Sequence, residues 1–263
     1  MKKKLGLALS GGGSKGLLQA GALQFFEENK IRFNTLSGTS AGSIVSGLYS
    51  CGKKPIEILE FFESTKMFST THLAFNYKGF INTPTLRSDF EKAIENPNIE
   101  ELDYSLQIVA TNLLDGSMKV FDKGNLIDAI LASSSFPGVF TPMKIDGILY
   151  SDGGMVNNFP IDLIHNKVDV SVGINLSTFE SVDENNLSSM FDILNRSYDI
   201  IRNTNLRTKN AIADINFVPT MGLNLGTFDT DPKKLNEIFE IGYDYTQNYF
   251  KKNPDKLSLL INP

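Results

Sequence analysis

The sequence of 263 residues is poor in the side chains that build metal and disulfide sites. It has two histidines and a single cysteine, Cys51, which excludes an intramolecular disulfide and offers nothing like the ligand clusters of structural zinc. Its formal net charge is -5, and it contains no long basic run. This argues against a nucleic-acid partner, because neutralising phosphates requires clustered Lys and Arg. A reducing, cytoplasmic setting fits this composition.

Long apolar runs are also missing. No segment approaches the ~18 uninterrupted apolar residues of a membrane span. The run Leu5–Leu9 is too short for the core of a signal peptide, and the next residues are interrupted by three glycines and Lys15. We therefore expect a cytoplasmic chain without a signal peptide or transmembrane segment. With 41% hydrophobic and 21% charged residues, it has the composition of a globular protein, and we expect residues 1–263 to form a single domain.

The first fifty residues read as two strand–loop–helix units. The apolar run "KLGLALS" ends in three glycines and is followed by "KGLLQAGALQFFEEN", whose apolar residues recur at helical spacing. "FNTLS" then reads as a buried strand, "GTSAG" as a tight corner and Ser43 to Tyr49 as a helix that Gly52 can end in a left-handed cap. Consecutive units of this kind predict an α/β fold of three layers, a mostly parallel central sheet flanked by helices.

The rest of the chain continues this pattern. We expect helices in "IEILEFF" after Pro55, in "TLRSDFEKAI" and in "NLIDAIL", the last stopped by Pro137, and hairpins that turn at Asp115–Gly116 and Asp146–Gly147. "VDVSVGINL" and "INFVP" read as strands. "LSSMFDILNRSYDIIRNTNLRTKNAI" reads as one long helix, and "KKLNEIFEIGYDYTQNYF" as a closing one. The aromatic segment "FSTTHLAFNYKGFINT" is a candidate lid, or equally a loop that plugs into the core.

The glycine-rich loop "GGGSKG", Gly11 to Gly16, literally matches the dinucleotide pattern G-x-G-x-x-G. The second strand lacks the acidic residue that would hold a ribose, however, and Lys15 is not followed by the Ser or Thr of a phosphate-binding Walker loop. The same geometry can aim backbone N–H groups at negative charge at the start of a helix, as in an oxyanion hole. One donor of this kind contributes about 3 to 4 kcal/mol of transition-state stabilisation.

The corner "GTSAG", Gly38 to Gly42, fits a nucleophile elbow, a strained strand-to-helix turn that exposes the hydroxyl of Ser40. Small neighbours avoid a steric clash there. The amide of Ala41 could then join the glycine loop in binding an oxyanion.

Ser40 needs a base, and only His72 and His165 offer an imidazole. A triad of Ser40, Asp152 and His165 stays open, although α/β-hydrolases build several strands before their elbow and only one strand–helix unit precedes this one. The other candidate is Asp152 itself, on the glycine-flanked turn "SDGG". Partial burial raises a carboxyl pKa and strengthens a proton acceptor, and a positioned base typically contributes ~10²- to 10⁴-fold.

Taken together, the "GGGxxG" loop, "GxSxG" and "DGG", in this order, resemble the patatin-like phospholipase family and its bacterial branch. "ASSSFPGVFTP" and "DGGMVNNFP" are similar to further family segments. The resemblance spans roughly residues 5–176, and the helical C-terminal part, 185–263, is less diagnostic. The chain departs from the family pattern at Ser10, where plant members have Asp, and at Lys15, where Arg is common.

The resemblance implies a Ser-Asp dyad, with Ser40 as nucleophile, Asp152 as base, and the amides of Gly11, Gly12, Gly13 and Ala41 as oxyanion donors. It gives supporting roles to Lys15, Gly16, Gly38, Gly42, Pro137, Gly153 and Gly154. It implies no metal and no cofactor.

The resulting hypothesis is a serine lipid acyl hydrolase of phospholipase A or lysophospholipase type, with a lipid or acyl-ester substrate and transient contact with a membrane surface. A small-ester esterase with a Ser-Asp-His triad and a non-catalytic nucleotide-binding α/β protein are the alternatives. Candidates for lining an acyl channel, though such residues more often pack in a core, are Phe25, Phe61, Phe75 and Met155.

Overall fold

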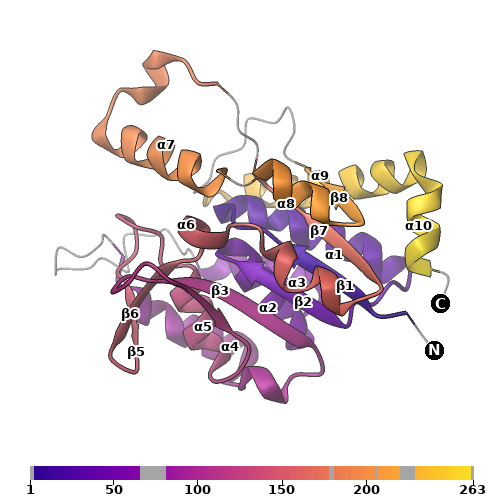
Figure 1. Ribbon diagram of the computed structural model, residues 1–263, viewed down its shortest axis with the longest axis horizontal. Coiled ribbons are helices and arrows are strands. Elements are labelled where there is room, and N and C mark those ends of the chain that lie inside the picture. Colours follow the sequence, from indigo (N-terminus) through magenta and orange to yellow (C-terminus); the bar gives the residue numbers. More distant parts are fainter. Residues whose placement is uncertain (1–2, 66–80, 178–180, 205, 220–228, 262–263) are drawn as a thin grey trace.

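The computed structural model describes residues 3–65, 81–177, 181–204, 206–219 and 229–261. Within them lies an eight-stranded sheet of order β5-β6-β3-β2-β1-β7-β8, with β4 paired to β3 (Figure 1). Strands β3, β2, β1, β7 and β8 run parallel, and the pairs β3/β4, β3/β6 and β5/β6 are antiparallel. The strands are β1 Leu5–Leu9, β2 Thr35–Thr39, β3 Ser105–Asn112, β4 Met118–Phe121, β5 Met143–Ile145, β6 Ile148–Asp152, β7 Val170–Ile174 and β8 Ile215–Phe217.

Helices cover both faces of this sheet, which confirms the predicted three-layer, mostly parallel α/β class. Alternate residues of β1 separate the two faces, since Leu5, Leu7 and Leu9 belong to the large core whereas Ala8 packs with a smaller cluster around Phe159. No described helix is long and apolar enough to cross a membrane. The helices are α1 Gly16–Glu28, α2 Ala41–Ser50, α3 Pro55–Thr65, α4 Arg87–Ile94, α5 Leu126–Ser133, α6 Gly154–Asn157, α7 Met190–Arg202, α8 Leu206–Ile212, α9 Pro232–Lys252 and α10 Pro254–Ile261.

The C-terminal segment is built into the same body. Strand β8 extends the sheet beside β7, and α9 packs on α1 so closely that a Cβ at Gly21 would lie 2.1 Å from the Phe239 carbonyl oxygen. The facing residue Gly242 would meet the Leu18 carbonyl oxygen at 2.2 Å. Two helices can approach this closely only where both lack side chains. The single domain over residues 1–263 stays a prediction.

Several local predictions are confirmed. Gly52 follows α2 with φ 82°, as expected of a left-handed cap, and the β5–β6 hairpin turns at Asp146 and Gly147, both with positive φ. The helix predicted in "NLIDAIL" is α5, but it ends at Ser133, before Pro137, so the proline does not itself stop it. The candidate lid falls mostly within residues 66–80, outside the described residues.

The prediction of one long helix over residues 187–212 is wrong, because the chain forms α7 and α8 with a break after Arg202. Two side chains at the break bond to helix carbonyls. The Asn203 amide donates to the Asp199 carbonyl at 2.7 Å, and the Thr204 hydroxyl donates to the Ile201 carbonyl at 2.8 Å. Such bonds compete with the backbone ladder and favour the end of a helix. Helix α10 was not predicted at all.

Strand register brings two distant turns together on β3. Strand β2 pairs with β3 as far as Thr39 opposite Val109, and β6 pairs with β3 from Asp152 opposite Ala110. The residue after Asp152 confirms the proximity, because a Cβ at Gly153 would lie 2.2 Å from the Val109 carbonyl oxygen and 3.0 Å from the Thr39 methyl group. The loop that begins with Ser40 and the end of β6 therefore meet at one place.

Candidate active site

Ser40 occupies the corner between β2 and α2 in a strained backbone conformation. Its φ of 53° and ψ of -123° are sparsely populated by residues other than glycine, which costs about 1–3 kcal/mol. Neighbouring bonds hold this conformation. The Ser40 amide donates to Ser133 Oγ at 2.8 Å, and Ser133 Oγ in turn donates to the Val109 carbonyl at 2.6 Å. The elbow predicted from "GTSAG" is thus present, and α5 supports it.

Close backbone packing explains why the elbow is flanked by glycine. A Cβ at Gly42 would lie 2.2 Å from the Leu9 carbonyl oxygen, and one at Gly38 would lie 2.5 Å from the Gly42 carbonyl oxygen. Gly16 faces the Ala41 methyl group, 3.0 Å from where its own Cβ would be. The start of α2 therefore lies directly against β1 and the start of α1, which brings the glycine loop next to Ser40.

Asp152 is the last residue of β6, and only 1% of it is exposed. Its Oδ1 accepts hydrogen bonds from the Gly154 amide at 2.7 Å and from the Tyr198 hydroxyl at 2.8 Å. Its Oδ2 is buried and has no hydrogen-bond partner among the described residues. This carboxylate therefore keeps one oxygen available as a proton acceptor.

Burial raises the pKa of Asp152 above its ordinary value of 3.8. Smaller opposing effects come from Ser40, the Gly154 amide, the Tyr198 hydroxyl and the positive charge of Arg202, each of which lowers the pKa. The Ser40 hydroxyl is thus close enough to affect the titration of the carboxyl group, although the two side chains do not form a hydrogen bond of full geometry in this structure. Apo sites often leave such a pair loose until substrate binds.

The glycine loop and the first turn of α2 supply amides at the same place. Gly12, Gly13 and Ala41 line the pocket with Ser40, and none of their amides has a hydrogen-bond partner among the described residues. Gly11 differs, because its amide donates to the Asn158 carbonyl at 3.0 Å. That amide therefore already has an acceptor, and we do not include Gly11 among the oxyanion donors that we propose below. A Cβ at Gly11 would lie 2.4 Å from Asn158 Oδ1 and 3.1 Å from Ser40 Cβ, so glycine at this position leaves room for both side chains.

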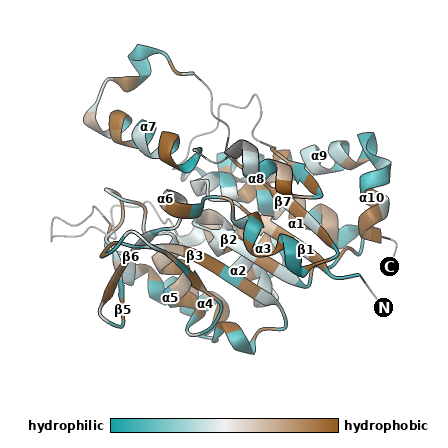
Figure 2. Ribbon diagram, viewed as in Figure 1, coloured by the Kyte–Doolittle hydropathy of each residue, from teal (hydrophilic) through white to brown (hydrophobic). Residues whose placement is uncertain are grey.

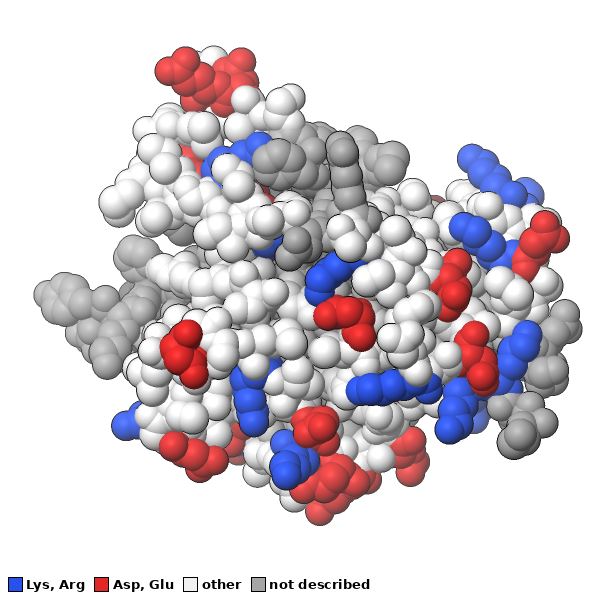
Figure 3. All heavy atoms as spheres, in the orientation of Figure 1, with Lys and Arg blue, Asp and Glu red and all other residues white. Residues whose placement is uncertain are grey.

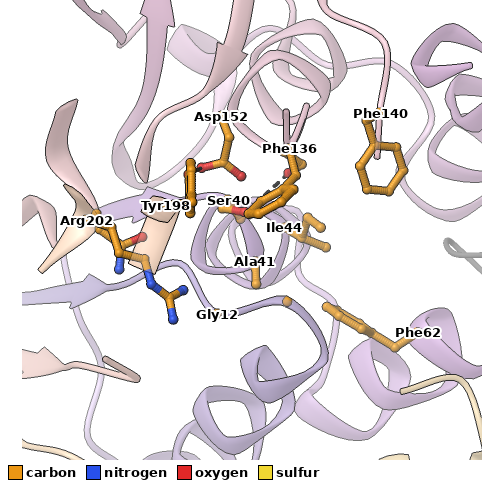
Figure 4. Close-up of a pocket in the computed structure, with 13 residues that line it drawn as sticks. Gly12, Ser40, Ala41, Ile44, Phe62, Phe136, Phe140, Asp152, Tyr198 and Arg202 are labelled. Carbon is orange, nitrogen blue, oxygen red and sulfur yellow. Dashed lines mark hydrogen bonds between the residues drawn. The ribbon is translucent and has the colours of Figure 1, made fainter. Parts of the chain in front are cut away.

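The pocket around Ser40 joins a polar side to an apolar side. Figure 4 places Asp152, Tyr198 and Arg202 on one side of Ser40, and Phe62 and Phe140 on the other. The free space is about 30 Å³, enough for a water molecule but not for an acyl chain. Side chains lining the pocket must therefore move before a long chain can enter.

Pro137 shapes the apolar side. It follows Phe136 in a turn closed by the Val139 amide, which donates to the Phe136 carbonyl at 3.2 Å, and proline favours this second turn position. Phe136, which begins the turn, and Phe140, which follows it, both line the pocket. The ring of Phe136 also lies 4.5 Å from that of Tyr198, centroid to centroid.

The acyl-channel candidates named from sequence lie elsewhere. Phe25 stacks on Phe250 and Phe61 packs against Phe90, both in the core. Phe75 is outside the described residues, and Met155 lines a neighbouring cavity. Phe62, the next residue after Phe61 on α3, faces the pocket instead.

His165 lies away from the Ser40 pocket. Its Nδ1 is 3.0 Å from Ser171 Oγ, and Ser171 pairs with Gly6 near the amino end of β1, whereas Ser40 follows the carboxyl end of β2. The imidazole is thus at the opposite edge of the sheet and does not serve Ser40 in this structure. His72 is outside the described residues. Lys15 ends a short 3₁₀ helix and does not line the pocket.

The residues around Asp152 were only partly anticipated. Gly153 and Gly154 follow it as expected, and a Cβ at Gly154 would lie 2.4 Å from the Tyr198 hydroxyl. Tyr198 and Arg202, one helical turn apart on α7, were not identified from the sequence. Their i, i+4 spacing on an otherwise apolar helix face was the available signal. Among the described residues, no group of three or more His, Cys, Asp or Glu could hold a metal.

An elbow serine beside a buried carboxylate, at the carboxyl edge of a parallel sheet, is an arrangement typical of serine hydrolases. Residues 7–165 match the family described as patatin-like phospholipase. The match covers more than half of the chain, so the chain belongs to this family, whose members are lipid hydrolases.

Individual relatives are distant. An uncharacterized protein of Acanthamoeba polyphaga mimivirus is 30% identical over 216 residues, which cover 74% of this chain and 72% of that protein. An uncharacterized NTE family protein of Mycobacterium tuberculosis is 28% identical, over 68% of this chain and 50% of its own length. Lysophospholipase NTE1 of Saccharomyces cerevisiae is 28% identical over 60% of this chain, but only 10% of the yeast protein is matched.

The fold is also similar to a solved structure. The crystal structure of VipD from Legionella pneumophila superimposes with a TM-score of 0.60 at 15% identity, and the match covers 96% of this chain and 67% of VipD. At this identity the likeness concerns the fold alone.

Proposed function

We propose that the protein is a serine lipid acyl hydrolase that cleaves carboxylic esters of phospholipids or lysophospholipids through an acyl-enzyme at Ser40. The observation that supports it best is the unpartnered Oδ2 of Asp152, a buried acceptor in the same pocket as the elbow serine. The family and the lysophospholipase named among its relatives favour a lipid ester as substrate.

In the first half-reaction Asp152 accepts the hydroxyl proton of Ser40 while Ser40 Oγ bonds to the ester carbonyl carbon. The carbonyl oxygen becomes an oxyanion, and the amides of Gly12, Gly13 and Ala41 are the donors that we assign to it. Ala41 is the first residue of α2, so the positive end of this helix adds to the stabilisation. Collapse of the tetrahedral intermediate releases the alcohol, which takes the proton from Asp152.

In the second half-reaction Asp152 accepts a proton from water, and the resulting hydroxide adds to the acyl carbon. The intermediate then collapses, Ser40 leaves with the proton from Asp152, and the fatty acid is released. A raised pKa suits this role, because a stronger acceptor promotes proton removal as long as the group is ionised at the working pH. The mechanism requires neither a metal nor a cofactor.

The test compares Ser40→Ala, Asp152→Asn and wild type on lysophosphatidylcholine, with fatty acid release measured by mass spectrometry. We expect no detectable turnover in Ser40→Ala, and a loss of about 10²- to 10⁴-fold in Asp152→Asn, the range for a positioned base. A fluorophosphonate probe should label wild type but not Ser40→Ala.

His165→Ala is the matched control, since His165 lies at the opposite edge of the sheet. Its rate should stay near that of wild type, whereas a Ser-Asp-His triad requires it to be inactive. Full activity in Asp152→Asn would refute the dyad. An unlabelled Ser40 in a protein that binds nucleotides would refute the enzymatic assignment and favour the glycine loop as a phosphate site.

A further inference from the structure

A second cavity lies beside the Ser40 pocket and shares two side chains with it. Its volume is about 250 Å³, far larger than the free space around Ser40. Asn158 and Arg202 line both spaces, so the two are separated only by side chains. The other lining residues are Gly154, Met155, Val156, Asn157, Phe159, Ser177, Ile201, Thr204 and Lys209.

Arg202, the last residue of α7, stands between the two cavities with an incomplete set of hydrogen bonds. Its side chain is only 9% exposed, and its Nη2 lies 2.9 Å from Asp199 Oδ1. Its Nε is buried and has no partner among the described residues. A buried guanidinium N–H without an acceptor is unfavourable, unless a ligand supplies one. In Figure 4 the guanidinium points from α7 toward the side of the pocket where Gly12 lies.

The chemistry of the second cavity suits a phosphate group. A guanidinium binds phosphate oxygens through two parallel N–H bonds, and Lys209 adds a second cation to the same wall. Lys209 Nζ forms an ion pair with Asp162 Oδ1 at 2.7 Å, whereas Arg202 keeps an Nε–H donor without a described acceptor. Because Asp162 and Asp199 offset part of the positive charge, the wall also tolerates a headgroup with its own cation.

The outer face of α7 is apolar beside this polar wall. Figure 2 shows hydrophobic turns along α7, and Figure 3 shows few charged side chains over it. Its exposed large apolar residues are Met190, Ile193, Leu194, Ile200 and Ile201, of which Ile201 also lines the second cavity. This apolar face suits contact with the lipid surface from which a substrate is taken, and Arg202 at the end of α7 would then lie near the phosphates of that surface.

We propose that Arg202 and the second cavity bind the phosphate of a phospholipid or lysophospholipid while its ester carbonyl lies at Ser40. The inference rests on the proposed function, to which it adds the residue and cavity that select phosphate-bearing lipids over neutral acylglycerols. Arg202 is then a specificity-determining residue, and it takes no part in bond making.

The main experiment measures kcat/KM for lysophosphatidylcholine and for a monoacylglycerol with the same acyl chain. The ratio of the two values should fall about 10- to 100-fold in Arg202→Gln, the range for losing a hydrogen bond to a charged group. The ratio for Arg202→Lys should lie between those of wild type and Arg202→Gln, because lysine keeps the charge but lacks the planar guanidinium. Arg196→Gln, on the same helix but outside both cavities, is the matched control and should keep the wild-type ratio.

An equal decrease in kcat/KM for both substrates in Arg202→Gln would overturn the inference, because it would mean that the substitution acts through Asp152 or through folding. A binding measurement separates this from failure of the proposed function. By calorimetry, glycerophosphocholine should bind wild type and Ser40→Ala alike and bind Arg202→Gln about 10-fold more weakly, and glycerol should bind none of them. Wild type that binds glycerol and glycerophosphocholine equally, or neither, contradicts the phosphate site whether or not the protein turns over esters.

Discussion

Replacing Asp152 by Asn should lower activity and also remove the loss of stability that the ionised carboxylate causes as pH rises. Asparagine keeps the size of the side chain and an oxygen that can accept from the Gly154 amide and the Tyr198 hydroxyl, as Oδ1 does now. It removes the charge and replaces one carboxylate oxygen by an Nδ2 donor. Because burial raises the pKa of Asp152, the ionised carboxylate is less stable in the folded protein than in the unfolded chain.

The sign and size follow from proton linkage. At pH values between the ordinary pKa of 3.8 and the raised pKa of the folded state, Asp152 holds a proton in the folded protein that it has lost in the unfolded chain. The free energy of unfolding therefore falls as pH rises through this window, by at most about 1.4 kcal/mol per pH unit from this one group. The stabilising contribution is complete below 3.8 and is lost by the time the pH passes the folded pKa. Asparagine does not ionise, so the stability of Asp152→Asn does not decrease through this group as pH rises.

The assay is urea unfolding of wild type and Asp152→Asn at a series of pH values from acidic to mildly alkaline. The buried Nδ2 of the new side chain adds an offset that does not depend on pH, so the diagnostic quantity is the slope. We expect the stability of the variant relative to wild type to rise with pH and then level off. A difference that is constant with pH, or that falls as pH rises, would refute the claim that the folded site holds Asp152 at a raised pKa.

Two further substitutions test the neighbours of the dyad. Tyr198→Phe removes a hydrogen bond that lowers the pKa of Asp152 but keeps the ring contact with Phe136. The acid limb of the pH profile of kcat/KM should therefore move to higher pH. An unchanged acid limb would contradict this reasoning. Gly38→Ala places a Cβ 2.5 Å from the Gly42 carbonyl oxygen and should destabilise the elbow by about 1–3 kcal/mol in thermal unfolding, with weaker fluorophosphonate labelling; wild-type stability would show that the turn can shift without cost.

The sequence was sufficient for features set by local chemistry. The glycine loop, the serine corner and the "SDGG" turn each lie directly after a strand whose apolar residues are consecutive, so the position of each turn follows from a few neighbouring residues. The order of the strands in the sheet, by contrast, depends on pairing between segments that are far apart in the sequence. Only the register of β3 shows that the end of β6 lies beside the start of the elbow.

Features that depend on facing helices could not be predicted. Phe61 and Phe62 are adjacent and equally apolar, and only the packing of Phe61 on Phe90 of α4 leaves Phe62 to face the pocket. Tyr198 is 46 residues from the carboxylate to which it donates, on a helix whose pattern indicates no more than an amphipathic surface. The engagement of the Gly11 amide likewise depends on Asn158, which is far away in sequence.

The uneven hydrogen bonding of Asp152 explains how one carboxylate could act without histidine under the proposed mechanism. Two donors bind Oδ1 and fix the orientation of the group, whereas Oδ2 has no described partner. Donors on both oxygens would lower the pKa and weaken the acceptor, and donors on neither would leave the group unoriented. Burial raises the pKa of Asp152 and so strengthens it as a proton acceptor. The same burial reduces the stability of the ionised protein, so removing the charge at position 152 should lower activity and remove the loss of stability with rising pH together.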